Sequence, residues 1–277
     1  MYESVSRGAN GLLVHDVVEL LSSGRAGLVS DVDGTISPIA ATPEDARVSP
    51  IAREALGILR HKLTLVAVVS GRTAAEARAM VGVDGITCIG NHGFEMLTES
   101  GRDPDIVPAA RPWVPRIAAV LARARTQIRQ PGIMLENKGA TASLHYRGAT
   151  DPEAARHELL ELLLQTAVPT GLRFEEGRMV FNLLPPLDVS KGSAVKRLAA
   201  EWQLDRLVYL GDDETDADAF QALHELRQSG EARTLSIAVV GSETPARVRD
   251  LADATLPSVQ AVAQLLACVA ELFKSEC

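Results

Sequence analysis

The sequence has few of the features that mark secreted, membrane-spanning or disulfide-stabilised proteins. Its three cysteines, Cys88, Cys268 and Cys277, are odd in number and have neither CxxC nor metal-ligand spacing. No apolar run reaches about 18 residues, the length needed to span a membrane, and no basic segment followed by an apolar one opens the chain. We therefore expect a reduced, cytoplasmic protein, in which Cys88 packs within a core strand.

Positive charge is also scarce. The formal net charge of −8 argues against general nucleic-acid binding, which needs a basic surface. An anionic small-molecule substrate would need local positive charge from a metal or from a few placed Lys and Arg side chains. With 46% hydrophobic and 23% charged residues the chain is globular, and a monomer is the favoured assembly state.

The most informative stretch is residues 28–38, in which an apolar segment stops at Asp31 and Asp33 and continues as Gly34-Thr35-Ile36-Ser37-Pro38. This pattern predicts a buried strand that ends in a tight loop. If the strand pleat continues, both carboxylates project to one side, where repulsion favours a proton or a cation between them. One carboxylate can then attack phosphorus while the other acts as general acid and base. The alternative interpretation is a simple turn with an N-cap.

Strands and helices alternate through most of the chain, which predicts a parallel α/β sheet. Strands are expected at 63–69, 86–89, 207–210 and 235–240, with helices at 11–22, 51–61, 73–81, 190–202 and 258–273. A proline-rich stretch at 101–116 precedes a different pattern, in which a helix followed by two short strands occurs twice: helices 113–130 and 151–167, and strands near 133–137, 140–147, 171–176 and 178–184. We expect an inserted α+β domain with an open sheet face at 107–186, and a core domain formed by 1–106 and 187–277.

Four polar stretches follow expected strands or open a helix beside them: Asp31-x-Asp33, Ser70-Gly71-Arg72, Lys191-Gly192 and Gly211-Asp212-Asp213. Ligands of parallel sheets bind beyond the carboxyl ends of the strands. Together the four stretches supply a nucleophile, an acid/base, phosphate-binding groups and oxygen ligands for Mg²⁺, namely Asp31, the backbone carbonyl of Asp33, and Asp212. Singly, each has a simpler interpretation as an N-cap, a solvated lysine or an acidic helix start. Their joint occurrence favours a phosphoryl-transfer site.

The same four stretches, in this order, resemble the motifs of the haloacid dehalogenase superfamily. The resemblance implies a Rossmann-like core in which Asp31 is the nucleophile and Asp33 the acid/base. It further implies phosphate binding by Thr35, Ser70, Gly71, Arg72 and Lys191, and a magnesium site that involves Asp31, Asp33, Asp212 and Asp213. A second aspartate at position 33 is typical of the phosphatases and mutases of that superfamily.

Segments before and within the insert resemble trehalose-6-phosphate phosphatases: Asn91-His92-Gly93-Phe94-Glu95, Leu135-Glu136-Asn137-Lys138 and His145-Tyr146-Arg147. In that family the insert is a cap that binds the sugar, which implies substrate binding by Glu136, Lys138, Arg147 and Asn182. A surface ion pair is the alternative for Glu136 and Lys138, and a structural role is expected for His92. Asn182 and Leu184 depart from the pattern, because these phosphatases usually carry a glutamate and an arginine there.

The predicted function is therefore magnesium-dependent hydrolysis of trehalose 6-phosphate through an aspartyl-phosphate. An amide at position 182 hydrogen-bonds a hydroxyl but cannot form the charge-assisted bond of a carboxylate. This keeps open the same chemistry on another glycosyl or pseudo-disaccharide phosphate. A sugar-phosphate-binding regulator without turnover and a phosphomutase are two further interpretations of the same residues.

Overall fold

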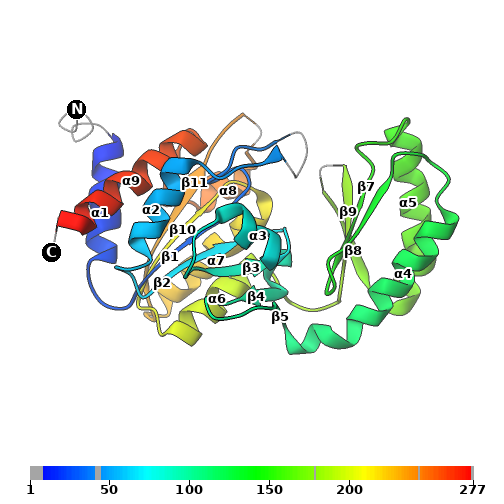
Figure 1. The fold of residues 1–277 in the computed structure, drawn as a ribbon, viewed down its shortest axis with the longest axis horizontal. Coiled ribbons are helices and arrows are strands. Elements are labelled where there is room, and N and C mark those ends of the chain that lie inside the picture. The colour runs from blue at the N-terminus through cyan, green and yellow to red at the C-terminus, as the bar shows by residue number, and fades with distance from the viewer. Residues whose placement is uncertain (1–8, 41–44, 178, 243, 276–277) are drawn as a thin grey trace. The chain divides into compact units, whose positions relative to one another are not determined.

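The computed structural model of the protein describes residues 9–40, 45–177, 179–242 and 244–275. The chain forms two compact units, each with its own apolar core (Figure 1). The core unit consists of Met1–Pro104 and Val189–Cys277, and the insert unit of Asp105–Asp188. The insert thus interrupts the core unit once along the chain.

A twisted sheet forms the centre of the core unit. Its strands are β1 (Ala26–Ser30), β2 (Leu65–Val69), β3 (Thr87–Gly90), β4 (Glu95–Leu97), β10 (Arg206–Gly211), β11 (Arg233–Val239) and β12 (Ala254–Leu256). Within this unit they lie in the order β12-β11-β10-β1-β2-β3-β4. The neighbours from β12 to β3 are parallel, as expected, but β4 runs antiparallel to β3. Only a 3₁₀ turn, η2 (Asn91–Gly93), joins β3 to β4, which is too short for a parallel crossover.

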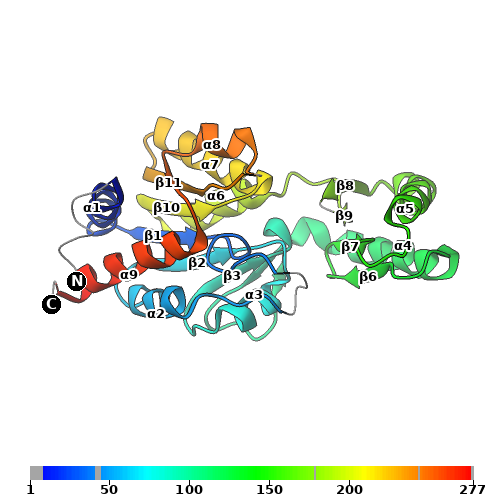
Figure 2. The same ribbon diagram turned by 90° about the horizontal axis from the view of Figure 1, so that it is seen from above.

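Helices cover both faces of this sheet (Figure 2). They are α1 (Ala9–Leu21), α2 (Pro50–Leu59), α3 (Ala74–Val81), α6 (Lys191–Trp202), α7 (Glu214–Gln228), α8 (Ala246–Leu251) and α9 (Val259–Ser275). Apolar side chains of α1, α2, α3 and α9 pack in one cluster, and those of α6, α7 and α8 pack in another. Both faces of β2 are therefore buried, which explains its continuous apolar sequence. Cys88 is buried in β3, as predicted.

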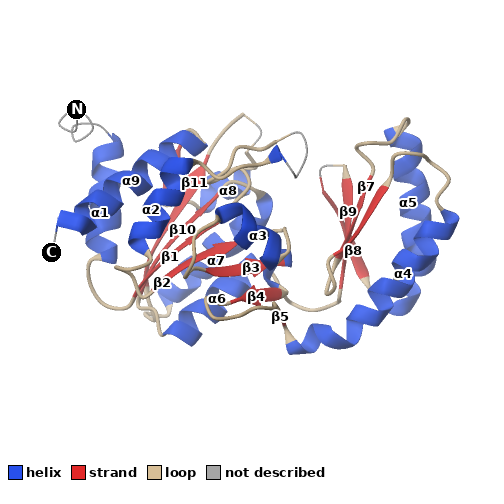
Figure 3. Cartoon of the chain, in the orientation of Figure 1, coloured by secondary structure: helices blue, strands red, loops and turns tan. Residues whose placement is uncertain are grey.

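The insert unit begins with β5 (Asp105–Ile106) and is built on an antiparallel sheet (Figure 3). Its further elements are η3 (Pro108–Trp113), α4 (Val114–Gln127), β6 (Met134–Asn137), β7 (Ala142–His145), α5 (Pro152–Thr166), η4 (Val168–Thr170), β8 (Arg173–Gly177) and β9 (Val180–Leu184). The strand order is β6-β7-β9-β8, and α4 and α5 pack on one face. The strand expected from 178 starts at Val180, and residue 178 lies outside the described residues.

None of the helices within the described ranges combines the length and the apolar character that crossing a membrane requires.

The carboxylate of Asp253 joins β11 of the core sheet to α7, and it supports a stability prediction. It accepts hydrogen bonds from the backbone and hydroxyl of Ser236, both at 2.8 Å, and pairs with Arg227 Nη2 at 2.6 Å. Burial raises the pKa of Asp253, but the bonds from Arg227 and Ser236 outweigh it and hold the pKa below 3.8. Asp253→Asn should therefore lower the free energy of unfolding at pH 7 by about 1–3 kcal/mol.

Because the pKa is depressed in the folded state, this stabilisation exists above the unfolded pKa and is lost as pH falls through the folded value. Urea titrations at pH 7 and below pH 4 should show the difference between the two proteins shrinking in acid. Asp250→Asn, at an exposed position on α8, is the matched control. A pH-independent difference would contradict the assignment.

Candidate active site

The loop after β1 places Asp31 at the carboxyl edge of the core sheet. β1 ends at Ser30, and the Asp31 backbone N–H continues the ladder by donating to Leu210 O at 2.8 Å. The Asp31 side chain is buried. Gly34 has φ +90°, and a Cβ there would lie 2.1 Å from Asp212 Oδ2, so only glycine fits this close approach. The loop thereby brings the ends of β1 and β10 together.

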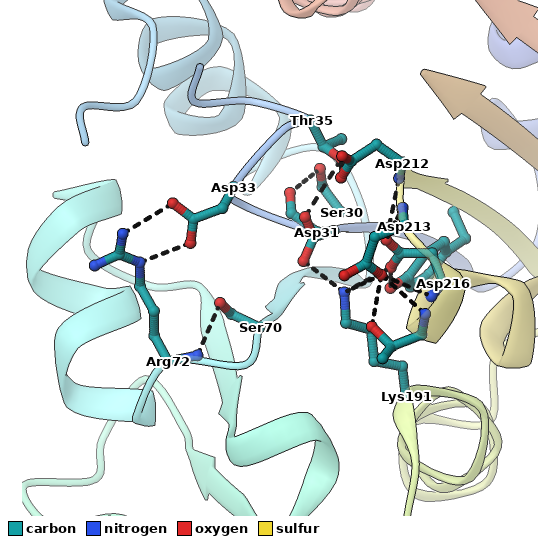
Figure 4. Close-up of polar contacts among 12 residues, drawn as sticks. Ser30, Asp31, Asp33, Thr35, Ser70, Arg72, Lys191, Asp212, Asp213 and Asp216 are labelled. Carbon is teal, nitrogen blue, oxygen red and sulfur yellow. Dashed lines mark hydrogen bonds and ion pairs between the residues drawn. The ribbon is translucent and has the colours of Figure 1, made fainter. Parts of the chain in front are cut away.

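Lys191 is the most buried cation of the site, with a side chain only 2% exposed. Its Nζ lies 2.7 Å from Asp31 Oδ1 and 2.8 Å from Asp216 Oδ1 (Figure 4). Lys191 is the first residue of α6, where the helix dipole disfavours a cation. Burial opposes the charged form, but the carboxylates of Asp213, Asp216 and Asp31 supply compensating charge and keep the pKa of Lys191 above its usual value.

The start of α7 is a second rigid element of the site. Asp213 is its N-cap, and Asp216 returns a bond to close a capping box. Asp216 is fully buried: it accepts bonds from the Asp212 and Asp213 backbone N–H groups at 3.0 and 3.1 Å and from Tyr209 Oη at 2.6 Å. These bonds fix the loop that presents the Asp212 side chain. Thr35 Oγ1 also lies 3.2 Å from Asp212 Oδ1.

Negative charge exceeds positive charge in this cluster. One ammonium, Lys191, lies among the carboxylates of Asp31, Asp212, Asp213 and Asp216. Burial, followed by the neighbouring carboxylates of Asp216 and Asp213, raises the pKa of Asp212 to about 7. Burial likewise raises the pKa of Asp31, against the opposing effect of Lys191. One oxygen from each of Asp31, Asp212 and Asp216 lies within 4.8 Å of the others. Such an oxygen-rich, electron-rich set suits a hard divalent cation.

Asp33 does not converge with Asp31, contrary to the expectation from the strand pleat. Its carboxylate turns to Arg72, which holds it by two bonds, from Nε at 2.6 Å and from Nη2 at 2.9 Å (Figure 4). The reason is that β1 ends at Ser30, so the alternation of a strand does not apply to residues 31–33. The side chain of Asp33 therefore lies outside the metal-compatible oxygen set found among the described residues. The side chain of Asp213, which caps α7, lies outside this set as well.

Two phosphate-binding candidates contact Asp31, namely Thr35 Oγ1 at 3.4 Å and Lys191 Nζ at 2.7 Å, and the others lie in the loop after β2. Ser70, at the end of β2, is buried, and its Oγ accepts a bond from the Arg72 N–H at 3.2 Å. At Gly71, a Cβ would lie 2.6 Å from the ring of His92, which places His92 beside this loop. Gly192 allows close approach of α6 and α7, because a Cβ there would lie 2.4 Å from Asp218 O.

The sugar-binding candidates all lie in the insert unit. Glu136 Oε2 lies 3.5 Å from Lys138 Nζ and 3.1 Å from His145 Nε2. Burial raises the pKa of Glu136, but the bonds from His145 and Lys138 outweigh it and lower the pKa overall. Asn182 Oδ1 accepts a bond from Ser143 Oγ at 2.9 Å. Arg147 is exposed in the turn after β7.

Sequence reasoning assigned no role to several members of these networks. Asp216 follows the fourth polar stretch closely, and an acidic residue three positions after an N-cap aspartate is a capping signal that could have identified it. Tyr209 is a polar residue in an apolar strand, and its hydroxyl needs a partner when buried. His145 lies in a segment that resembles the family, whereas Ser143 carried no signal, since only strand pairing places it beside Asn182.

Comparison with known proteins identifies relatives of this chain. The family model for trehalose-phosphatase matches residues 29–254. The trehalose-phosphate phosphatases of Mycobacterium tuberculosis H37Ra and Mycobacterium marinum are each 32% identical to it, over 246 and 248 residues. These alignments cover 80% and 83% of the chain but 59% and 61% of the relatives, so the chain spans about three fifths of the length of the curated proteins it matches.

Solved structures share the fold. The crystal structure of a trehalose-6-phosphate phosphatase related protein has a TM-score of 0.74 at 21% identity and covers 91% of this chain and 100% of its own. The C-terminal domain of the Candida albicans trehalose-6-phosphate phosphatase has a TM-score of 0.73 at 22% identity, with coverage of 95% and 97%. A haloacid dehalogenase-like hydrolase from Bacteroides thetaiotaomicron has a TM-score of 0.59 at 14% identity, with coverage of 92% and 100%. These matches confirm the α/β fold predicted from the sequence, a haloacid dehalogenase-like core with an inserted α+β unit. The chain belongs to the trehalose-phosphatase family.

Proposed function

We propose that the protein is a magnesium-dependent phosphatase that hydrolyses trehalose 6-phosphate to trehalose and phosphate. The observation that carries this proposal is the buried carboxylate of Asp31, fixed at the end of β1 by Lys191 Nζ at 2.7 Å. A fixed carboxylate beside a permanent cation is suited to act as a nucleophile toward an anionic phosphate, because the cation offsets charge repulsion.

The reaction proceeds in two displacements. An oxygen of Asp31 attacks phosphorus, the bond between phosphorus and the sugar oxygen breaks, and Asp33 gives its proton to the leaving sugar oxygen. Asp33 then takes a proton from water, which attacks the aspartyl-phosphate and releases phosphate and the Asp31 carboxylate. The Asp33 carboxyl lies 2.6 Å from Arg72 Nε. For both steps it moves away from this guanidinium toward the reacting atoms. Ser70, Thr35, the Gly71 loop, Arg72 and Lys191 bind the phosphoryl oxygens.

Magnesium is the cofactor of this proposal. Asp31, Asp212 and the Asp33 backbone carbonyl would hold the ion, and Asp213 beside them would add negative charge. When bound, the ion neutralises phosphate charge and polarises the phosphoryl group. Asp216, the third member of the oxygen set, would orient the loop that carries Asp212, since its oxygens accept bonds from Lys191, Tyr209 and two backbone N–H groups.

In this proposal, one part of the chain carries out the reaction and the other binds the sugar. The functional domains are residues 1–106 with 187–277 for the chemistry and 107–186 for sugar recognition. Glu136, Lys138, Arg147 and Asn182 bind hydroxyls of the disaccharide. Glu136 is already arranged for this purpose, because contacts with Lys138 Nζ at 3.5 Å and His145 Nε2 at 3.1 Å keep its carboxylate in one position.

Removal of the cation gives a prediction for stability. The folded pKa of Asp212 is about 7, against 3.8 for an ordinary aspartate. Without divalent cations, the folded state therefore binds more protons than the unfolded state between pH 3.8 and about pH 7. The free energy of unfolding falls as pH rises through this range. At pH 8 in chelator, Asp212→Asn should melt about 2–4 °C above the unmodified protein. Millimolar magnesium should stabilise the unmodified protein more than the variant. Equal responses of the two proteins would argue against Asp212 as a ligand.

The covalent intermediate gives a second prediction. Rapid acid quenching during turnover of ³²P-labelled trehalose 6-phosphate should trap a protein-bound phosphate that is stable in acid and labile in alkali. Asp31→Asn should lose at least about 10³-fold in turnover, because the amide is not a nucleophile. Asp84→Asn, at an exposed site in the same unit, serves as the control. Retained activity in Asp31→Asn would eliminate the mechanism.

Substrate choice gives a third prediction and separates the candidate functions. Phosphate release from trehalose 6-phosphate at saturating magnesium should exceed release from glucose 6-phosphate by at least about tenfold in kcat/KM, as expected for a site that recognises hydroxyls of both rings. A higher rate with a glucosylglycerol phosphate or a pseudo-disaccharide phosphate would favour the second candidate, for which Asn182 and Leu184 are the motivating residues. Binding without phosphate release would indicate a regulator instead of an enzyme.

A further inference from the structure

The strand register of the insert sheet aligns one polar residue from each strand. Glu136 of β6 faces Ser143 of β7, Ser143 faces Asn182 of β9, and Asn182 faces Glu175 of β8. Side chains directly opposite one another in antiparallel strands have Cβ atoms about 4.5–5.5 Å apart. The four residues, which we call the polar row, therefore form a continuous line across all four strands of this sheet.

The polar row lies on the sheet face that α4 and α5 leave open. Side chains alternate along β8, and Phe174 packs edge-on against Phe181 in the helix-covered core. Glu176 is on the same side as Phe174, since it binds Tyr146 Oη at 2.9 Å and Arg156 Nε at 2.5 Å. Glu175 therefore projects from the open face.

The polar row has unused hydrogen-bonding capacity beside Glu175. Asn182 Oδ1 is occupied by Ser143, but among the described residues its amide group donates to no partner. Glu175 Oε1 accepts a bond from Arg173 Nη1 at 2.8 Å, and within the same residues its other oxygen has no partner. The pair thus offers an amide donor next to a carboxylate acceptor. This combination suits the hydroxyls of a sugar, whereas the two carboxylates, Glu136 and Glu175, would repel a phosphate.

Arg173 holds Glu175 in place. Besides its bond to Glu175, its guanidinium donates to the backbone oxygens of Pro185 at 3.2 Å and Leu187 at 3.3 Å. An exposed ion pair of this kind, with side chains 43% and 57% exposed, contributes little to stability. Two of these bonds fix the guanidinium on the backbone, and the third restricts the rotamers of Glu175, which lowers the entropy lost when the glutamate binds a ligand.

We propose that Glu175 is a specificity-determining residue, which binds a sugar hydroxyl together with Asn182 and is positioned by Arg173. This inference rests on the proposed function, since it requires a glycosyl phosphate as substrate. The carboxylate that position 182 lacks is supplied from the neighbouring strand. A charge-assisted bond from Glu175 compensates for the weaker neutral bond of the amide.

The test compares Glu175→Gln with Glu176→Gln. Both variants change one glutamate of β8 to its amide, but only Glu175 is on the open face. The measured quantity is the ratio of kcat/KM for trehalose 6-phosphate to kcat/KM for p-nitrophenyl phosphate, which has no sugar. Glu175→Gln should lower this ratio about tenfold, mainly through KM, as expected for loss of a hydrogen bond to a charged group. Glu176→Gln should leave the ratio unchanged.

A rescue variant strengthens the test. Glu175→Gln combined with Asn182→Glu returns a carboxylate to the adjacent strand and should recover most of the ratio. Equal ratios for Glu175→Gln and Glu176→Gln, in an enzyme that prefers trehalose 6-phosphate, would overturn this inference and leave the proposed function intact. An unmodified protein without that preference would instead overturn the proposed substrate, and the same comparison on the preferred sugar phosphate would then decide the role of Glu175.

Discussion

The core unit depends on one buried ammonium group. Lys191 Nζ binds Asp31 and Asp216 at 2.7 and 2.8 Å, and these residues come from the loop after β1 and from α7, while Lys191 itself opens α6. Removing the ammonium would leave the carboxylates of Asp31 and Asp216 buried and uncompensated, a situation that costs about 3–5 kcal/mol. The same contact that orients the candidate nucleophile therefore also holds three segments of the core unit together, and the chain cannot alter one role without the other.

This arrangement leaves the site with more negative charge than its lysine neutralises. Burial is the largest cause of the raised pKa values of Asp212, about 7, and Asp216, about 6. Neighbouring carboxylates raise the pKa of Asp212 further, whereas Lys191 lowers both pKa values. A core optimised for stability would replace such groups with apolar ones, and proteins retain them where chemistry needs them. The charge imbalance is therefore an argument for cation binding that is independent of any relative, because it follows from the positions of the side chains.

Sequence reasoning located the site but not its contacts. Polar stretches at strand ends could be predicted because parallel strands place their carboxyl ends at one edge, and the Asp31, Lys191 and Asp212 segments indeed meet there. The direction of Asp33 could not be predicted, because the pleat rule applies only within a strand and β1 stops at Ser30. The antiparallel direction of β4 could not be predicted either. A short turn and a crossover helix both begin with polar residues and glycine after a strand, so the sequence does not distinguish them.

In the insert unit, strand pairing places side chains next to each other that the order of residues along the chain does not reveal. Along the chain, Asn182 stands where the family resemblance implies a glutamate, and the sequence alone suggests a weakened sugar site. Across the sheet, Asn182 faces Glu175 and Leu184 faces Arg173. Strand β8 therefore places a carboxylate opposite position 182 and a guanidinium opposite position 184. Register is set by pairing, and a sheet face presents residues of neighbouring strands as one surface. The recognition chemistry of such a face is therefore a property of the cross-strand row, and a substitution on one strand is judged correctly only with its partner.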